Sequence, residues 1–121
     1  MRHFIVIVLL CASANAVADE WDEALQLDSY GALEEFWETD VLPMDSLRKL
    51  MVFREPLRTE VDVLIREDGT TVGRITAGSG NEEFDAAVME VVGRYRYRPT
   101  EQNDPPQPVV VPYYRAVGTR Y

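Results

Sequence analysis

The sequence predicts an α+β fold: a small two-layer sandwich with the element order strand, strand, helix, strand, an antiparallel sheet, and short N-terminal helices. Three observations carry this prediction. Apolar residues alternate over 59–66, they recur at helical spacing over 84–95, and a β-prone run covers 108–117. A hairpin and a returning third strand leave one face of the sheet for the helix to cover.

The first predicted strand runs from Thr59 to Arg66. Its apolar residues Val61, Val63 and Ile65 alternate with charged ones, so one face is buried and the other is mostly in water. A turn follows over 67–70, where Gly69 can adopt a positive φ at no steric cost.

The second predicted strand covers 71–77. Its apolar members Val72 and Ile75 are three residues apart, which breaks the period of two. Gly73 lies between them and predicts a β-bulge that restores the apolar face.

A helix is predicted after the loop 78–81. Ser79 or Asn81 can cap it, and Ser79 with Glu82 has the spacing of a capping box. Its apolar stripe comprises Phe84, Ala87, Val88, Val91 and Tyr95. Acids occupy the first turn, and the end of the helix carries Arg94, Arg96 and Arg98 before Pro99. The helix dipole favours this order of charges, and proline ends the helix.

The charges are unevenly distributed along the chain. Residues 19–40 hold nine acids and no base, whereas residues 41–121 hold twelve acids and eleven bases. The main domain is therefore close to neutral. It lacks the basic face that nucleic acid binding requires, so no nucleic acid partner is expected.

The acidic segment also carries apolar residues. Leu33, Phe36 and Trp37 have the spacing of one face of a short helix, and a second short helix is predicted over 46–52. Two interpretations are open. The segment packs its apolar side on the domain and keeps its acids in water, or it is an arm whose aromatic residues dock in a partner's groove.

The first residues have the features of a signal peptide. A positive start precedes an apolar run over 4–10, and small residues follow up to Ala18. The apolar stretch is shorter than the roughly 20 residues that span a bilayer. We therefore expect residues 1–18 to be a leader cleaved near Ala16 or Ala18, so that the protein is exported. Membrane contact is expected only if the leader is retained.

This leader contains Cys11 and His3, the only cysteine and the only histidine. A mature chain without them has no cysteine nucleophile, serine–histidine triad, imidazole or thiolate metal site, or disulfide. No cofactor is expected. Paired carboxylates are the remaining route to catalysis. The acids of 41–117, however, fall on predicted turns, solvent faces or a helix start, so the sequence predicts that the protein is not an enzyme.

The last predicted strand has prolines at 108 and 112, four residues apart, so their main chains face the same side. Proline has no N–H to donate and belongs on an unpaired side. Alternate residues then bond the neighbouring strand, and Val110 and Tyr114 hold the outward donors. The candidate partner-binding residues are Val109, Val110, Val111, Pro112, Tyr113 and Tyr114. The prolines either blunt this edge against aggregation or leave enough donors for a visiting strand, including that of a second copy in a homodimer.

Several short motifs follow one another in a family-specific order. They are Asp68-Gly69, Val72, Ile75, Ser79-Gly80, Phe84-Asp85-Ala86-Ala87, Val91, Tyr95-Arg96-Tyr97-Arg98-Pro99 and the final strand of valines and prolines. Together they resemble the TonB C-terminal domain over roughly 41–117. The chain thus divides into a leader 1–18, an acidic amphipathic segment 19–40 and a TonB C-terminal-like domain 41–121.

The resemblance implies a periplasmic interaction module linked to TonB-dependent transport. Such a module binds an extended segment of an outer-membrane receptor, or of another envelope protein, by edge-strand addition. The chain departs from the family plan because a leader stands where a membrane helix is expected and no proline-rich spacer follows. An alternative is a structural or envelope-assembly protein in which the acidic segment seals the edge strand.

Overall fold

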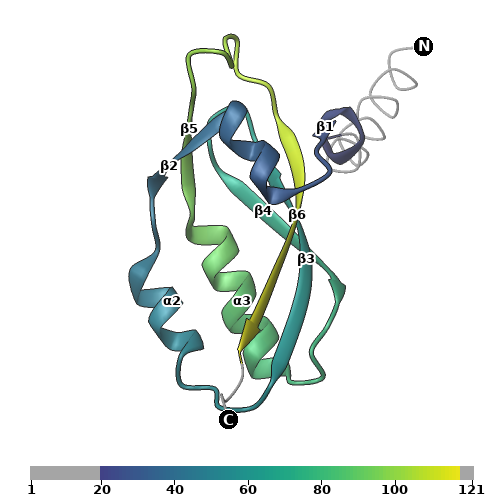
Figure 1. Cartoon of the computed structure of the whole chain (residues 1–121), viewed down its shortest axis with the longest axis vertical. Coiled ribbons are helices and arrows are strands. Elements are labelled where there is room, and N and C mark those ends of the chain that lie inside the picture. The colour runs from purple at the N-terminus through teal and green to yellow at the C-terminus, as the bar shows by residue number, and fades with distance from the viewer. Residues whose placement is uncertain (1–19, 118–121) are drawn as a thin grey trace, which may run out of the picture.

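The structure, a computed structural model, describes residues 20–117. After a helical turn over 20–23 the elements are β1 (Leu25–Gln26), the 3-10 helix η1 (Tyr30–Glu35), β2 (Trp37–Val41), α2 (Met44–Leu50), β3 (Leu57–Ile65), β4 (Thr71–Ala77), α3 (Glu82–Arg94), β5 (Arg96–Pro99) and β6 (Val109–Val117). Figure 1 shows the long strands β3, β4 and β6 crossing one another beside α3. The α+β class predicted from the sequence is confirmed.

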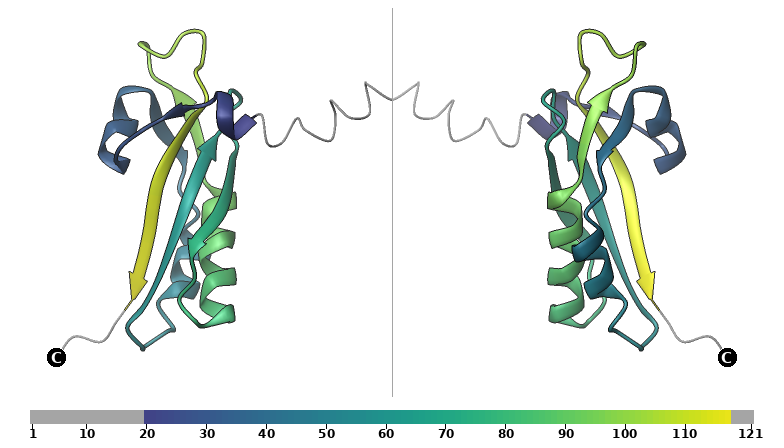
Figure 2. Two further views of the ribbon diagram at one scale, coloured as in Figure 1. Left: turned by 90° about the vertical axis from the view of Figure 1, so that its right-hand side faces the viewer. Right: turned by 90° about the vertical axis from the view of Figure 1, so that its left-hand side faces the viewer.

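The main sheet has the strand order β1-β6-β3-β4. β3 pairs antiparallel with β4 on one side, and with β6 along all nine of its residues on the other. Figure 2 shows α2 and α3 together on one side of these strands. The sequence predicts an antiparallel sheet, but the observed sheet is mixed, because β1 pairs with β6 in parallel.

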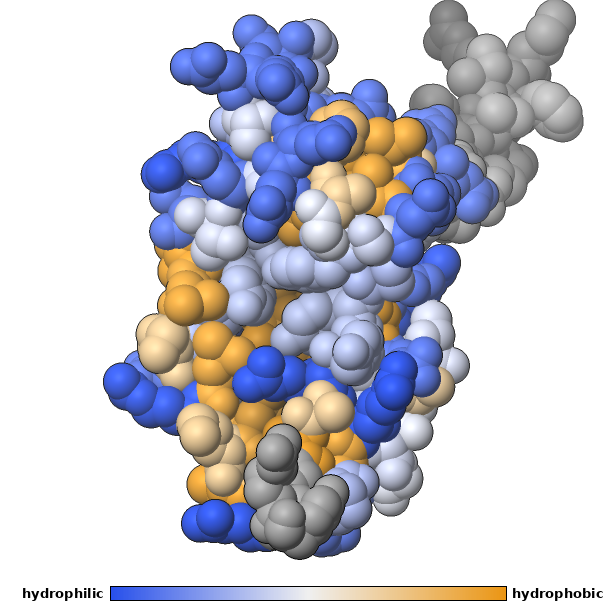
Figure 3. Space-filling model, viewed as in Figure 1, coloured by the Kyte–Doolittle hydropathy of each residue, from blue (hydrophilic) through white to orange (hydrophobic). Residues whose placement is uncertain are grey.

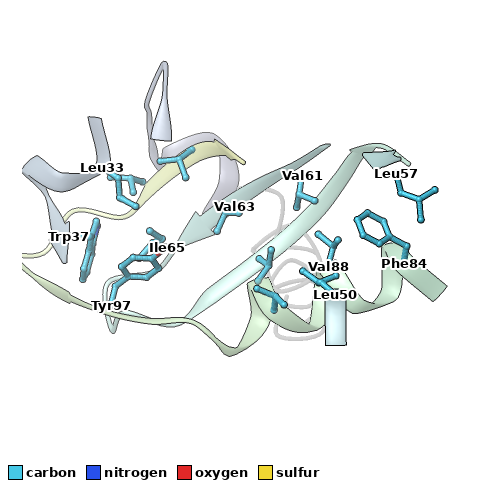
Figure 4. Close-up of a cluster of buried hydrophobic side chains, with 14 residues drawn as sticks. Leu33, Trp37, Leu50, Leu57, Val61, Val63, Ile65, Phe84, Val88 and Tyr97 are labelled. Carbon is cyan, nitrogen blue, oxygen red and sulfur yellow. The ribbon is translucent and has the colours of Figure 1, made fainter. Parts of the chain in front are cut away.

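The core lies between this sheet and α3. Odd-numbered residues of β3 and β6 face the helix, and Figure 4 shows Val61, Val63 and Ile65 in line with Val88 and Phe84. Trp37, Leu50 and Tyr97 extend the cluster toward the other elements. At about 25 cal/mol per Å² of apolar surface buried, such a contiguous cluster supplies the main stabilisation of a small domain.

Helix α3 begins as its polar first residues predict. Asn81 is the N-cap, and its Oδ1 accepts a hydrogen bond from the N–H of Phe84 at 3.0 Å. The capping box between Ser79 and Glu82 is not formed, because the Ser79 hydroxyl instead bonds the main chain of Asn81. The helix ends at Arg94, so Arg96 and Arg98 lie in a strand and not in the last turn as predicted.

A second, two-stranded sheet joins β2 to β5. Trp37 therefore begins a strand. The prediction that Leu33, Phe36 and Trp37 share one face of a helix is wrong, because η1 ends at Glu35. Arg98 forms ion pairs with Glu38 at 2.7 Å and with Asp40 at 3.3 Å across this sheet. The acids of the N-terminal segment thus have a long-range partner that local periodicity does not show.

Gly73 does not mark a bulge. The β3–β4 register is continuous there, and the irregularity lies near Glu60, which pairs with Ala77 while Val61 pairs with Ile75. A Cβ at Gly73 would lie 2.9 Å from a Val92 methyl and 3.1 Å from a Val61 methyl. The glycine is therefore required for the close approach of α3 to the sheet.

Gly69 holds the β3–β4 turn against β5. Its φ is +84°, and its carbonyl accepts a hydrogen bond from the N–H of Tyr97 at 3.0 Å. A Cβ at this position would overlap the carbonyl oxygen of Tyr97. Main-chain atoms of a paired strand cannot move aside as a flexible side chain can, so only glycine fits.

We expect Gly69→Ala to lower the free energy of unfolding by about 2 kcal/mol or more, through strain at positive φ and the overlap with β5. Gly93→Ala is the matched control, because nothing lies within 4 Å of its Cβ position in α3. It should cost nothing and can gain up to about 1 kcal/mol from helix propensity. Urea unfolding measures both, and similar stability of the two variants would contradict the assignment.

Candidate functional site

The main chain of β6 has two sides, and only one of them is used by β3. On the other side, the Pro108 carbonyl accepts from the N–H of Leu25 at 3.0 Å and the Val110 carbonyl from the N–H of Leu27 at 2.9 Å. The even-numbered residues therefore point their N–H and C=O groups away from β3, as the spacing of Pro108 and Pro112 predicts. The β3–β6 register has no irregularity, so this alternation continues to Ala116.

β1 covers the beginning of the outward side. It pairs Leu25 with Val109 and Gln26 with Val110. The expectation that the last strand lies at the rim of its sheet is thus wrong for its first residues. Over these residues the acidic segment seals the edge, as the alternative interpretation of the sequence expected.

The second half of the same side is open among the residues 20–117. No strand is paired with the outward groups of Pro112, Tyr114 and Ala116. Tyr114 and Ala116 carry N–H donors, whereas Pro112 has none and lies where β1 has ended. Two donors and three carbonyl acceptors are therefore directed away from the sheet over this short stretch.

The six residues predicted as a binding site all lie on β6 but in different environments. Val109 and Val111 are fully buried in the main core, and Val110 is buried on the opposite face. Tyr113 is half-buried, whereas Pro112 and Tyr114 are exposed. Of these side chains, only the last three can contact an added strand without disturbing a core.

Two residues beside the open half were not predicted from the sequence. The guanidinium of Arg58, on β3, lies 4.4 Å from the ring centroid of Tyr114. The ring of Tyr30, on η1, lies 5.7 Å from that of Tyr113. The strand register brings Arg58 next to the edge, and no local sequence signal indicates it.

Below the open edge, tyrosines from three elements meet. The hydroxyls of Tyr30 and Tyr97 are 2.8 Å apart, and the rings of Tyr95 and Tyr97 are stacked at 5.8 Å. Burial raises the pKa of Tyr95 to about 12. Burial, with a smaller contribution from the hydrogen bond to Tyr30, raises the pKa of Tyr97 further. The cluster is neutral at physiological pH and anchors η1 against β5 and β6.

The N-terminal segment packs on the face of the sheet opposite the helices. Trp21 and Ala24 are buried against Leu64 and Val110 in a small second core. The guanidinium of Arg74 lies 4.3 Å from the centroid of the Trp21 ring. Of the two interpretations of the acidic segment, the structure therefore shows the packed one.

Exposed apolar side chains also gather around α2. They are Val41, Leu42, Met44, Met51 and Val52, and Figure 3 shows apolar surface on this part of the molecule. They offer side-chain contacts only, whereas the β6 edge adds unpaired main-chain groups that bind an extended chain of almost any sequence. The open edge is therefore the stronger candidate site.

Apart from the final strand, the residues that make up the sequence motifs hold the fold and do not line this edge. The carboxylate of Asp85 accepts from Thr59 Oγ1 at 2.6 Å and from the Ser79 N–H at 3.1 Å, which ties the start of α3 to β3. Desolvation raises the pKa of Asp85, but these hydrogen bonds outweigh it and keep the pKa below its usual value.

The stretch 20–117 contains no group of three histidine, cysteine, aspartate or glutamate residues placed to hold a metal ion. No helix within it has both the length and the apolar character needed to cross a membrane.

A small sheet backed by two helices, with an open strand edge, defines a class of protein-interaction domain. Residues 34–112 match the family model described as TonB C terminal. The chain belongs to the TonB C-terminal domain family, a family of non-catalytic, envelope-associated domains that bind other proteins such as outer-membrane receptors. No curated protein and no solved structure matches the chain significantly.

We expect the tyrosine cluster to make stability sensitive to alkaline pH. Because the folded-state pKa of Tyr95 is about 12 and the unfolded value is about 10, the stabilisation is complete below pH 10. It is lost progressively as the pH rises from about 10 to about 12, since only the unfolded chain can ionise freely there. Urea unfolding at pH 8 to 11 measures this loss.

Tyr97→Phe removes one of the titrating groups and should make the alkaline loss smaller. Tyr114→Phe is its control, because the Tyr114 ring is 60% exposed. A stability that stays constant to pH 11 in the unmodified protein would contradict the burial of the cluster.

Proposed function

We propose that the protein is a periplasmic interaction module that binds an extended segment of an outer-membrane receptor, or of another envelope protein, by strand addition to the outward side of β6. The observation that carries the proposal is the open stretch from Pro112 to Ala116, with its unpaired donors on Tyr114 and Ala116. Family membership supports the link to TonB-dependent transport. The predicted leader, which would deliver the chain to this compartment, lies outside the described residues.

The chemistry of the edge suits an added strand more than a bound small molecule. Main-chain hydrogen bonds supply affinity in strand addition, and flanking side chains supply selectivity. Here Tyr114 with Arg58 flanks the edge on one face, and Tyr113 with Tyr30 flanks it on the other. An incoming segment therefore meets an aromatic surface on both sides and a positive charge on one.

A second candidate is a structural or envelope-assembly protein that uses the same fold as a scaffold. The pairing of β1 with Val109 and Val110 favours it, because it seals part of the edge within one chain. Of the six sequence-predicted residues, Pro112, Tyr113 and Tyr114 keep a binding role under the first candidate, and none does under the second. A homodimer through the open half of β6 is a further use of the same groups.

The test uses Tyr114→Pro in the full-length chain. Proline removes the outward N–H without removing a bond to β3, and Pro112 already occupies an equivalent position two residues earlier. We expect binding of purified outer-membrane receptors of the source organism to weaken at least about tenfold, which is about 1.4 kcal/mol. Isothermal titration calorimetry measures the dissociation constants.

Tyr114→Thr is the matched control, since it removes the ring but keeps the N–H. It separates loss of the main-chain donor from loss of the side chain, and thermal unfolding of both variants checks that the fold is intact. Equal receptor binding by the proline and threonine variants would refute strand addition at this edge. Failure of every receptor to bind the unmodified chain would favour the scaffold.

A further inference from the structure

The strand β1 occupies a position that an added strand would need. Main-chain hydrogen bonds from this segment reach the carbonyls of Pro108 and Val110, which are outward groups of the same side that is open from Pro112 on. The chain therefore carries its own strand on the first half of the candidate binding edge. It leaves the second half free.

The attachment of this strand is short compared with the rest of the sheet. β1 contributes two paired residues to β6, whereas β3 contributes nine. Its other attachments include the buried Trp21 and Ala24, the partly buried Leu27 on the main core, and an ion pair between Glu20 and Arg66 at 2.8 Å whose side chains are more than one-third exposed. An exposed ion pair of this kind adds little, so Trp21 is the main anchor.

We propose that residues 20–27 are a displaceable strand that competes with the partner for β6. The proposal rests on the proposed function and extends it. Binding along the open half alone leaves the segment in place, and binding along the whole strand from Pro108 to Ala116 displaces it. The segment thereby lowers the affinity for a partner that binds the whole strand, because only molecules with the segment open are competent to bind it.

The geometry also specifies the partner. β1 runs parallel to β6, and its departure uncovers Leu64 and Val110, which are now 1% and 4% exposed. A strand that replaces it must carry an apolar side chain opposite Val110, or these two residues face water. The inferred partner is therefore a protein segment that adds to β6 with an apolar residue at that position.

The experiment uses the segment itself as the probe. A fluorescent peptide of residues 20–29 is titrated into the unmodified full-length chain, into Trp21→Ala/Leu25→Pro and into Leu25→Thr. The double variant loses the main anchor and the Leu25 donor, whereas the threonine variant keeps both. We expect the peptide to bind the double variant at least about tenfold more tightly than the other two proteins, because the tethered segment no longer competes. Equal binding to all three proteins would overturn the proposal.

Hydrogen exchange of the unmodified chain provides a second measurement if the double variant fails to fold. The Leu27 amide should exchange at least about tenfold faster than the amides in the middle of β3, since the segment opens without global unfolding. Equal protection would show that the segment is part of the fixed fold.

Receptor titration separates the two proposals. Receptors that bind the unmodified chain and the double variant equally would leave strand addition intact and contradict the competition. Peptide binding without receptor binding would reject only the receptor as the partner.

Discussion

The structure depends on the alternation of main-chain groups along β6. In this strand the odd residues bond β3 and the even residues point away from it, and no residue can serve both sides. Nine consecutive pairs with β3 fix this alternation without an irregularity. Everything about the candidate site follows from it: which donors are available, which carbonyls β1 uses, and why proline is tolerated at 108 and 112.

Several residues within the stretch that matches the family hold the fold and do not contact the open edge. Gly69 permits the close contact with Tyr97, Gly73 permits the close contact with α3, and Asp85 ties that helix to β3. These positions are constrained by overlap and by hydrogen bonds inside the domain. The open edge requires only an outward N–H, which nearly every residue provides. A family resemblance can therefore be specific for the fold while it says little about the partner.

The elements predicted well from the sequence are those whose cause is local. The alternation of β3, the cap at Asn81 and the stripe of α3 are all encoded within a few residues. The pairings of β2 with β5 and of β1 with β6 join residues about sixty to eighty-five positions apart, and their short strands have no period of their own. Only packing decides them: Trp37 is buried once β2 pairs with β5, and Trp21 is buried once the segment crosses the sheet. The two prolines predict which residues of β6 point away from β3, but no local sequence pattern predicts the pairing of β1 with them.

The two prolines also explain how a single edge can serve two strands in turn. Pro108 and Pro112 flank Val110, so the outward donors fall into two sets, Val110 alone and then Tyr114 with Ala116. The chain's own segment covers the first set and ends before Pro112. Because proline has no N–H, no donor is left unpaired at that position. The second set stays open without exposing a buried residue. Under the proposed competition, an incoming strand forms its first bonds on the open set before it contacts β1, and displacement then proceeds stepwise along the strand.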